Sequence, residues 1–111
     1  LNSWGSELSS KYIYRNELFP IVTQQKGNNQ VLMQAFGNEK SLLKTNETKN
    51  ATYWSRSRND LWIKGESSGN NQKINGIYTD GNSVLYKVNQ KGLEDACHKK
   101  GQWTCFYRKI Q

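Results

Sequence analysis

The sequence predicts an α+β domain built on a compact, mainly antiparallel sheet with one or two short helices. Three observations lead to this prediction: short β-prone runs cover much of the chain, polar clusters rich in Gly and Asn separate them, and one helical pattern stands between them. The chain has 111 residues, which is close to the usual size of one domain. We therefore expect a single domain over residues 1–111, with residues 1–17 as an N-terminal extension.

The first two strands are expected on either side of the turn cluster Lys26–Asn29. The runs Phe19–Thr23 and Val31–Ala35 flank this cluster, and both are short and β-prone. Two such runs joined by a turn of Gly and Asn are typical of a hairpin. The pattern therefore predicts two paired strands.

One short helix is expected from Asn38 to Glu47. Asn38 can cap the helix, and Glu39 would lie at the positive end of the helix dipole. Leu42 and Leu43 are expected on one face of this helix.

The rest of the sheet is predicted from four aromatic or β-branched runs bounded by polar turns: Ala51–Arg56, Leu61–Lys64, Lys73–Thr79 and Val84–Val88. Loops this short suit antiparallel connections. Beyond them, a second short helix is expected over Gly92–Lys100 and a last strand over Thr104–Arg108.

The charge balance limits the partners that the chain can have. The net charge of +7 would attract polyphosphate backbones, acidic membranes or a small phosphorylated ligand, and it does not distinguish among them. The basic residues are spread along the chain, whereas a nucleic-acid footprint is usually more concentrated. A nucleic acid is therefore not the expected partner, although a basic nucleic-acid-binding module remains the alternative from another functional class.

Two further expectations concern location and assembly. No apolar run approaches the ~20 residues of a membrane-spanning helix, and the first ten residues lack the pattern of a secretory signal. We expect a cytoplasmic protein without a membrane partner. Because so small a domain buries a limited fraction of its surface, we also expect a homodimer that hides further aromatic area.

The stretch from Tyr53 to Asn70 carries the candidate chemistry. It contains hydroxyls, guanidinium groups, an ammonium group and a Gly/Ser turn, which together can donate hydrogen bonds to a phosphate, and its Trp side chains could stack on a purine. The candidate substrate-binding residues are Trp54, Ser55, Arg56, Arg58, Lys64, Glu66, Ser67, Ser68 and Gly69.

A purely structural interpretation of the same stretch is favoured by residue chemistry alone. In it Trp54 and Trp62 belong to the core, Arg56 and Arg58 alternate outward on a strand, and the Ser/Gly turn is only a turn. Glu66 would bind ligand in the first interpretation, or simply pair with Lys64 or a nearby Arg in the second.

The spacing of these residues resembles that of a known family. YWSRSR, then LW, then KGESSGN is similar to the signature of the phosphoribosyl-AMP cyclohydrolases. Val31–Glu39 resembles the family's VLM-x-A-(aromatic)-x-N-E segment, and Ala96–His98 and Cys105–Arg108 resemble its C-terminal motifs. The resemblance implies a compact homodimer with the active site at the subunit interface. It also implies hydrolytic opening of the purine ring of phosphoribosyl-AMP in histidine biosynthesis, by a water that zinc activates.

The resemblance extends to the metal site only in part. In the family one zinc-binding Cys comes from an acidic D-C-D-x-D segment, which also supplies carboxylates for magnesium, and two come from the C-H…C-F-Y-R segment. This chain has Cys97 and Cys105 but no third Cys, and Asp80 is the one carboxylate between Glu66 and Glu94. The resemblance therefore implies Cys97, Cys105 and Asp80 as metal ligands, zinc that is weak or absent, and no magnesium site of the family's form.

Several alternatives remain open at this point. His98, as the only histidine, is the candidate catalytic acid or base, or else a partly buried polar residue. Cys97 and Cys105 are metal ligands, buried thiols or one disulfide. Three functions remain open for the whole chain. It retains the reaction, and His98, Asp80, Asp95 or a water completes the zinc ligands. Otherwise it binds a nucleotide-like phosphorylated molecule without this catalysis, or it keeps only the fold and acts as an interaction module.

Overall fold

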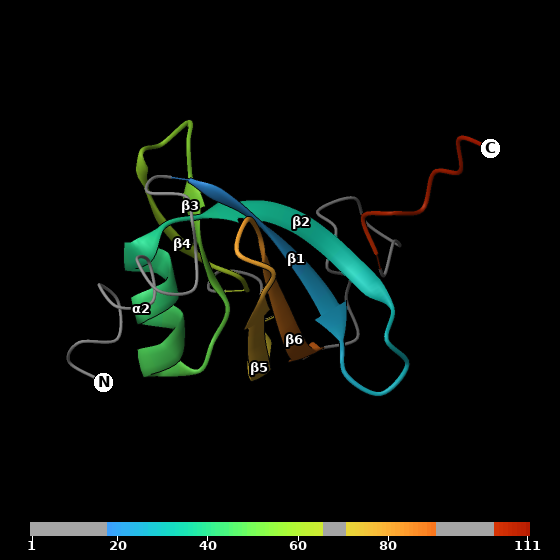
Figure 1. Ribbon diagram of the computed structural model, residues 1–111, viewed down its shortest axis with the longest axis horizontal. Coiled ribbons are helices and arrows are strands. Elements are labelled where there is room, and N and C mark those ends of the chain that lie inside the picture. Colours follow the sequence, from blue (N-terminus) through green and yellow to red (C-terminus); the bar gives the residue numbers. More distant parts are fainter. Residues whose placement is uncertain (1–17, 66–70, 91–103) are drawn as a thin grey trace.

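The computed structural model describes residues 18–65, 71–90 and 104–111. Figure 1 shows a curved sheet with a helix and a small hairpin at one end. The elements are β1 (Phe19–Gln25), β2 (Val31–Gly37), α2 (Glu39–Thr48), β3 (Thr52–Ser55), β4 (Asp60–Ile63), β5 (Gln72–Thr79) and β6 (Val84–Gln90). The predicted α+β class is confirmed.

The larger sheet has four strands in the order β2-β1-β6-β5, and β3 pairs with β4 in a separate hairpin. The pairs β1–β2, β5–β6 and β3–β4 are antiparallel, as the sequence predicts. The pair β1–β6 is parallel, which the sequence analysis did not predict. Short loops impose antiparallel pairing only on strands that follow one another, and most of the domain lies between β1 and β6.

Alternation along the central strands builds the core. In β1, Ile21 and Thr23 point inward, and in β6 Val84, Tyr86 and Val88 do the same. Side chains on successive residues of a strand face opposite sides, so each strand contributes every second residue to one layer. The hydrophobic core consists of Phe19, Ile21, Leu32, Met33, Leu42, Ala51, Tyr53, Val84, Tyr86 and Val88.

Helix α2 begins where the sequence predicts it. The side chain of Asn38 accepts from the backbone N–H of Ser41 at 2.9 Å, and the Ser41 hydroxyl accepts from the Asn38 N–H at 2.8 Å. The prediction that Leu42 and Leu43 share one face is wrong, because Leu42 is buried and Leu43 is 42% exposed. Adjacent helical residues differ by ~100° in direction, and the buried face follows Leu42 and Thr45 instead.

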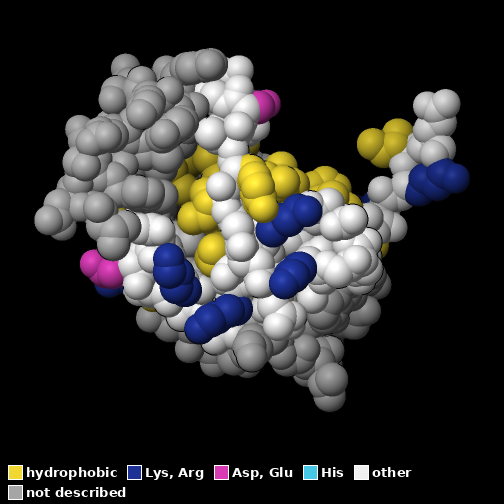
Figure 2. All heavy atoms as spheres, turned by 60° about the horizontal axis from the view of Figure 1, so that its bottom comes forward, with side chains coloured by type: hydrophobic (Ala, Val, Ile, Leu, Met, Phe, Trp, Pro, Cys, Tyr) yellow, Lys and Arg dark blue, Asp and Glu magenta, His cyan; other side chains and the backbone are white. Residues whose placement is uncertain are grey.

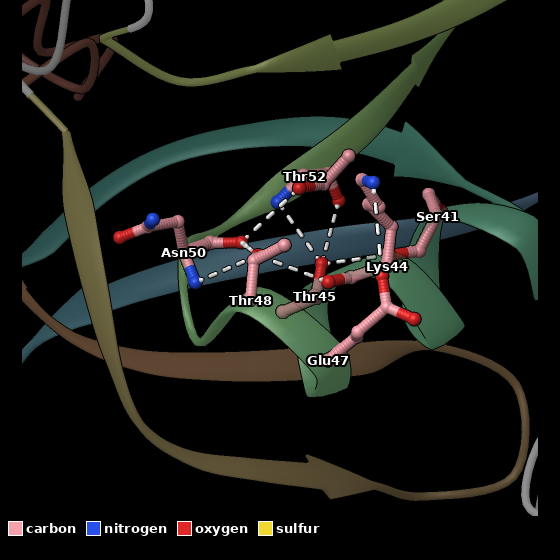
Figure 3. A network of polar contacts seen from close by, with 7 residues as sticks. All are labelled: Ser41, Lys44, Thr45, Glu47, Thr48, Asn50 and Thr52. Carbon is pink, nitrogen blue, oxygen red and sulfur yellow. Dashed lines mark hydrogen bonds and ion pairs between the residues drawn. The ribbon is translucent and has the colours of Figure 1, made fainter.

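A buried polar network attaches α2 to the hairpin (Figure 3). The Thr45 hydroxyl donates to the Ser41 carbonyl at 2.7 Å and accepts from the Thr52 N–H at 3.0 Å. The Tyr86 hydroxyl lies 3.0 Å from the same Thr45 oxygen. Helix α2, the start of β3 and the middle of β6 are therefore held together at one point, which fixes the direction in which β3 leaves the core.

Two predicted strand segments end differently in the structure. The run Ala51–Arg56 forms a strand only to Ser55, because residues 56–59 make a turn. The predicted last strand, Thr104–Arg108, is wrong. The Cys105 N–H donates to the Leu32 carbonyl, but the Thr104 hydroxyl takes the neighbouring carbonyl of Val31, so no strand ladder develops there.

Other expectations lie outside the described residues. The second helix over Gly92–Lys100 and the extension over residues 1–17 fall there. Within the described part of the chain, no helix is long and apolar enough to cross a membrane.

Candidate functional site

The β3–β4 hairpin is anchored in the core by Tyr53. Tyr53 pairs with Trp62 across the hairpin, and the two rings stack with their centroids 4.8 Å apart. The Tyr53 hydroxyl lies 2.6 Å from the Thr23 hydroxyl and donates to the Gln72 side-chain oxygen at 2.6 Å. Because side chains alternate along a strand, the neighbouring Trp54 faces away from this anchor.

The turn of the hairpin presents its two arginines to solvent. It covers residues 56–59, and Asn59 closes it in the left-handed conformation with φ of 53°. The Ser55 hydroxyl accepts from the Arg58 N–H at 3.3 Å and lies 3.4 Å from the Ser57 hydroxyl. Arg56 and Arg58 are both exposed. They extend from a turn, so the structural interpretation that they alternate outward on a strand is wrong.

An open cavity lies between this turn and the end of β2. Its volume is about 520 Å³, and its lining combines aromatic, cationic and hydroxyl groups from Ala35, Phe36, Trp54, Arg56 and Ser57. The Arg56 guanidinium carbon lies 4.1 Å from the centroid of the Phe36 ring. Figure 2 shows one face of the molecule on which Lys and Arg side chains border exposed hydrophobic side chains.

The arginines of the turn form no ion pair with a described carboxylate. Over residues 18–65, 71–90 and 104–111 the structure contains a single ion pair, between Lys44 and Glu47 at 3.7 Å. Asp60 lies on the same hairpin, opposite Ser55, but pairs with neither arginine, and the turn keeps one more positive than negative charge. A cavity bordered by such charge attracts anions.

The predicted substrate-binding residues do not all lie together. In the register of the hairpin, Ser55 pairs with Asp60 at the turn and Thr52 with Ile63 at the other end. Lys64 follows Ile63, and its N–H donates to the Ala51 carbonyl. Trp54, Ser55 and the two arginines therefore lie toward the turn, with Lys64 at the base. Glu66, Ser67, Ser68 and Gly69 lie outside the described residues.

The carboxylate of Asp80 is engaged in its own turn. One of its oxygens accepts from the N–H groups of Asn82 and Ser83, both at 2.9 Å, and from the Ser83 hydroxyl at 3.1 Å. These hydrogen bonds lower the pKa of Asp80 below its ordinary value, the two backbone bonds most strongly. The residue borders a second cavity, of about 280 Å³, with Val22, Tyr78, Thr79, Ser83, Val84 and Leu85.

Cys105 lies against the core at the other end of the sheet. Its N–H donates to the Leu32 carbonyl at 2.7 Å, and its side chain is half-buried. Leu32 follows Val31, which pairs with Gln24 near the end of β1, whereas Asp80 follows Thr79, which pairs with Val84 at the level of Ile21 near the start of β1. At about 3.3 Å per residue, this register separates Asp80 and Cys105 by roughly 12 Å along the strands.

The described residues do not complete a metal site. Among them no group of three or more His, Cys, Asp or Glu side chains is close enough to hold a metal ion. Cys97 and His98, the other predicted ligand and the predicted acid or base, lie outside the described residues. Zinc usually takes at least three protein ligands, so this part of one chain does not fit the ion that the resemblance implies.

Sequence reasoning missed part of the cavity. Ala35, Phe36 and Ser57 line it but were not predicted as site residues. The signal was present for Phe36, which is the aromatic residue of the upstream motif. Its relation to Arg56 depends on β2 and β3 lying beside each other, and no local pattern shows this.

The fold and the cavity define a small α+β domain with an open, cationic and aromatic-lined surface site. Comparison with known proteins narrows this class. The family model described as phosphoribosyl-AMP cyclohydrolase matches residues 33–107. The chain belongs to the phosphoribosyl-AMP cyclohydrolase family.

Individual relatives agree with this assignment. The phosphoribosyl-AMP cyclohydrolase of Chlorobium phaeobacteroides is 51% identical over 96 residues, which cover 85% of this chain and 68% of the relative. That of Chlorobaculum tepidum gives the same identity and coverage. The histidine biosynthesis bifunctional protein HisIE of Deinococcus radiodurans is 40% identical over 107 residues, which are 95% of this chain and 48% of the relative.

Proposed function

We propose that this chain binds phosphoribosyl-AMP in the cavity between β2 and the β3–β4 turn, as a cyclohydrolase-like protein of histidine biosynthesis. We further propose that its ring-opening step is impaired. Family membership supports the substrate class, and one observation carries the placement. That observation is the cavity in which the Arg56 guanidinium lies over the Phe36 ring and which Trp54 also lines.

The chemistry of the cavity suits a phosphorylated nucleotide. A guanidinium group presents its N–H donors in a fork that matches two phosphate oxygens, and it stays charged at any physiological pH. Trp54 offers a flat apolar surface on which a purine can stack. The Ser57 hydroxyl adds a donor to the same wall. The roles of Ser55, Arg58 and Lys64 in binding stay predictions.

The proposed impairment follows from the ligands that the chain can offer a metal. Bound zinc would supply an activated water for attack on the ring. The whole chain has only two Cys, and Asp80 already uses one carboxylate oxygen within its own turn. His98 as acid or base, and Cys97 with Cys105 as residual ligands, stay predictions, as does a cytoplasmic location.

We also propose a homodimer, because one copy separates the candidate metal ligands. Asp80 and Cys105 lie at opposite ends of the sheet, so a metal bound by both would need one residue from each of two copies. Phe106 is 59% exposed on the C-terminal segment, which extends away from the sheet (Figure 1). A second copy would remove such apolar surface from water.

The first experiment is turnover of phosphoribosyl-AMP by the zinc-supplemented full chain, followed through the ultraviolet change on ring opening. An intact family enzyme serves as the positive control. We expect slower turnover than the control with nucleotide binding retained. Turnover equal to the control would overturn the impairment, and failure to bind the nucleotide would overturn the proposed function.

A variant pair tests the placement of the site. Arg56→Gln is expected to weaken nucleotide binding by roughly tenfold or more, as expected for a lost charge-assisted hydrogen bond. Lys26→Gln, in the exposed β1–β2 turn, removes the same charge outside the cavity and should change affinity little. Equal effects of the two variants would mean that net charge alone attracts the nucleotide. Tight, steeply salt-dependent binding of unspecific RNA by all three proteins would instead favour the nucleic-acid alternative.

A further inference from the structure

The position of Phe36 beneath Arg56 suggests more than a lining role. Phe36 pairs with Pro20 in the β1–β2 ladder, which fixes its backbone. Its half-buried ring lies in the wall of the cavity, with the Arg56 guanidinium carbon 4.1 Å from its centroid. Arg56 itself belongs to a turn, where the backbone restricts a long side chain less than it does in a sheet.

The contact uses only one part of the guanidinium group. An aromatic ring attracts the cation through the flat face of the guanidinium, whereas the N–H donors of the guanidinium point outward in its own plane. A cation–π contact with Phe36 at this distance therefore leaves N–H donors of the guanidinium available for a ligand. No described carboxylate competes for these donors, since the one ion pair in the described ranges is Lys44–Glu47.

We propose that Phe36 is a positioning residue for Arg56: its ring holds the guanidinium with the donor edge directed into the cavity, ready for the phosphate of the nucleotide. This inference rests on the proposed function and adds the residue that determines where the phosphate binds. Holding a flexible side chain in its bound conformation before the ligand arrives lowers the entropy lost on binding. Phe36 thus acts on affinity without touching the reacting ring.

The expected effect follows from the strength of such contacts. An exposed cation–π contact corresponds to about a two- to fivefold change in an equilibrium constant. Phe36→Leu should therefore weaken AMP binding by about that factor and raise KM for phosphoribosyl-AMP without a matching fall in kcat. Phe36→Tyr, which keeps the ring, should restore the affinity.

The experiment measures AMP affinity by calorimetry for the full chain and for Phe36→Leu, Phe36→Tyr, Arg56→Gln and the double variant Phe36→Leu/Arg56→Gln. If Phe36 acts through Arg56, Phe36→Leu should have no further effect once Arg56 is Gln. Val31→Ala is the matched control. It shortens a partly exposed apolar side chain on the same strand outside the cavity.

A second readout does not depend on ligand. The ring current of Phe36 should shift the proton resonances of the Arg56 side chain in the unliganded protein, and Phe36→Leu should remove this shift. Unchanged AMP affinity in a folded Phe36→Leu variant, or equal losses from it with and without Arg56, overturns the positioning role while the proposed function stands. A wild-type chain that binds neither AMP nor phosphoribosyl-AMP overturns both.

Discussion

At the residue scale, the hydroxyl of Tyr53 determines the direction of a buried hydrogen-bond chain. It donates to the side-chain oxygen of Gln72, which can only accept, so the shared proton between Thr23 and Tyr53 must come from Thr23. The Gln72 amide then donates to the Gln90 oxygen at 3.0 Å. Four side chains from β1, β3, β5 and β6 are thereby joined in one order, which ends at Gln90, whose buried Nε2 has no hydrogen-bond partner among the described residues. The chain joins the hairpin that carries the site to the sheet.

The first prediction is that Tyr53→Phe costs about 1–3 kcal/mol of the free energy of unfolding. The substitution removes the donor to Gln72 and the acceptor for Thr23, and both groups are fully buried. Urea unfolding followed by circular dichroism measures the loss. Tyr78→Phe is the control, because Tyr78 is 54% exposed, and it should change stability by less than ~0.5 kcal/mol. Equal effects would contradict the importance of the chain of hydrogen bonds.

The second prediction concerns alkaline pH. Burial raises the pKa of Tyr53 and of Tyr86 above the ordinary value of 10.0, and the side-chain hydrogen bonds with Thr23 and Thr45 only partly oppose this. Because the pKa is higher in the folded state, the tyrosines of the unfolded chain ionise first as pH rises. The two neutral tyrosines therefore contribute fully to the free energy of unfolding below pH 10.0, and this contribution falls as pH rises above it. Tyrosinate absorbance from these two residues should appear only as the native circular dichroism signal disappears. Its appearance in a native chain would contradict the prediction.

At the element scale, short sequence patterns predicted the elements that neighbouring residues alone determine. The Asn38 cap fixed the start of α2, and the Gly/Asn cluster fixed the β1–β2 hairpin, so both could be predicted. The parallel pairing of β1 with β6 could not, because it joins residues as distant as Ile21 and Val84. The predicted final strand was wrong: residues 104–111 form no strand, and Thr104 contacts the Val31 carbonyl through its hydroxyl.

The candidate site shows the same division. Trp54, Arg56 and Arg58 follow one another closely on one hairpin, so a sequence motif could bring them together. The cavity also needs Phe36, from β2, and its contact with Arg56 arises only because β2 and β3 pack together through the fold. A resemblance to a family motif can mark such a residue, but its partner has to be found in the structure.

The third prediction tests the cap of α2. Asn38→Ala should lower the free energy of unfolding by about 1 kcal/mol, since it leaves the Ser41 N–H without its acceptor. Asn38→Asp keeps an acceptor oxygen and should retain most of the stability. Thermal and urea unfolding of the three proteins measure the difference. If Asn38→Asp lost as much as Asn38→Ala, the side-chain acceptor would not be the cause.

At the scale of the whole molecule, the small core and the exposed C-terminal segment favour assembly. Phe106 is 59% exposed and Ile110 fully exposed, and both follow Cys105, which is held against β2. Exposed apolar side chains on one segment are a recurrent feature of protein–protein contacts. In the homodimer that we propose, a second copy covers this segment and Cys105 approaches the Asp80 region of the other copy.

The last prediction is that the unfolding temperature rises with protein concentration, because assembly stabilises the folded state by mass action. Sedimentation should show a dimer that dissociates on dilution. Phe106→Ser with Ile110→Ser should weaken this dimer and flatten the concentration dependence, whereas Leu43→Ser is the control. Leu43 is also exposed, at 42%, but it lies on α2 at the far end of the sheet from the C-terminal segment (Figure 1). A monomer at all concentrations, with an unfolding temperature that does not depend on them, would mean that the site is formed within a single copy and that Asp80 and Cys105 cannot share a metal.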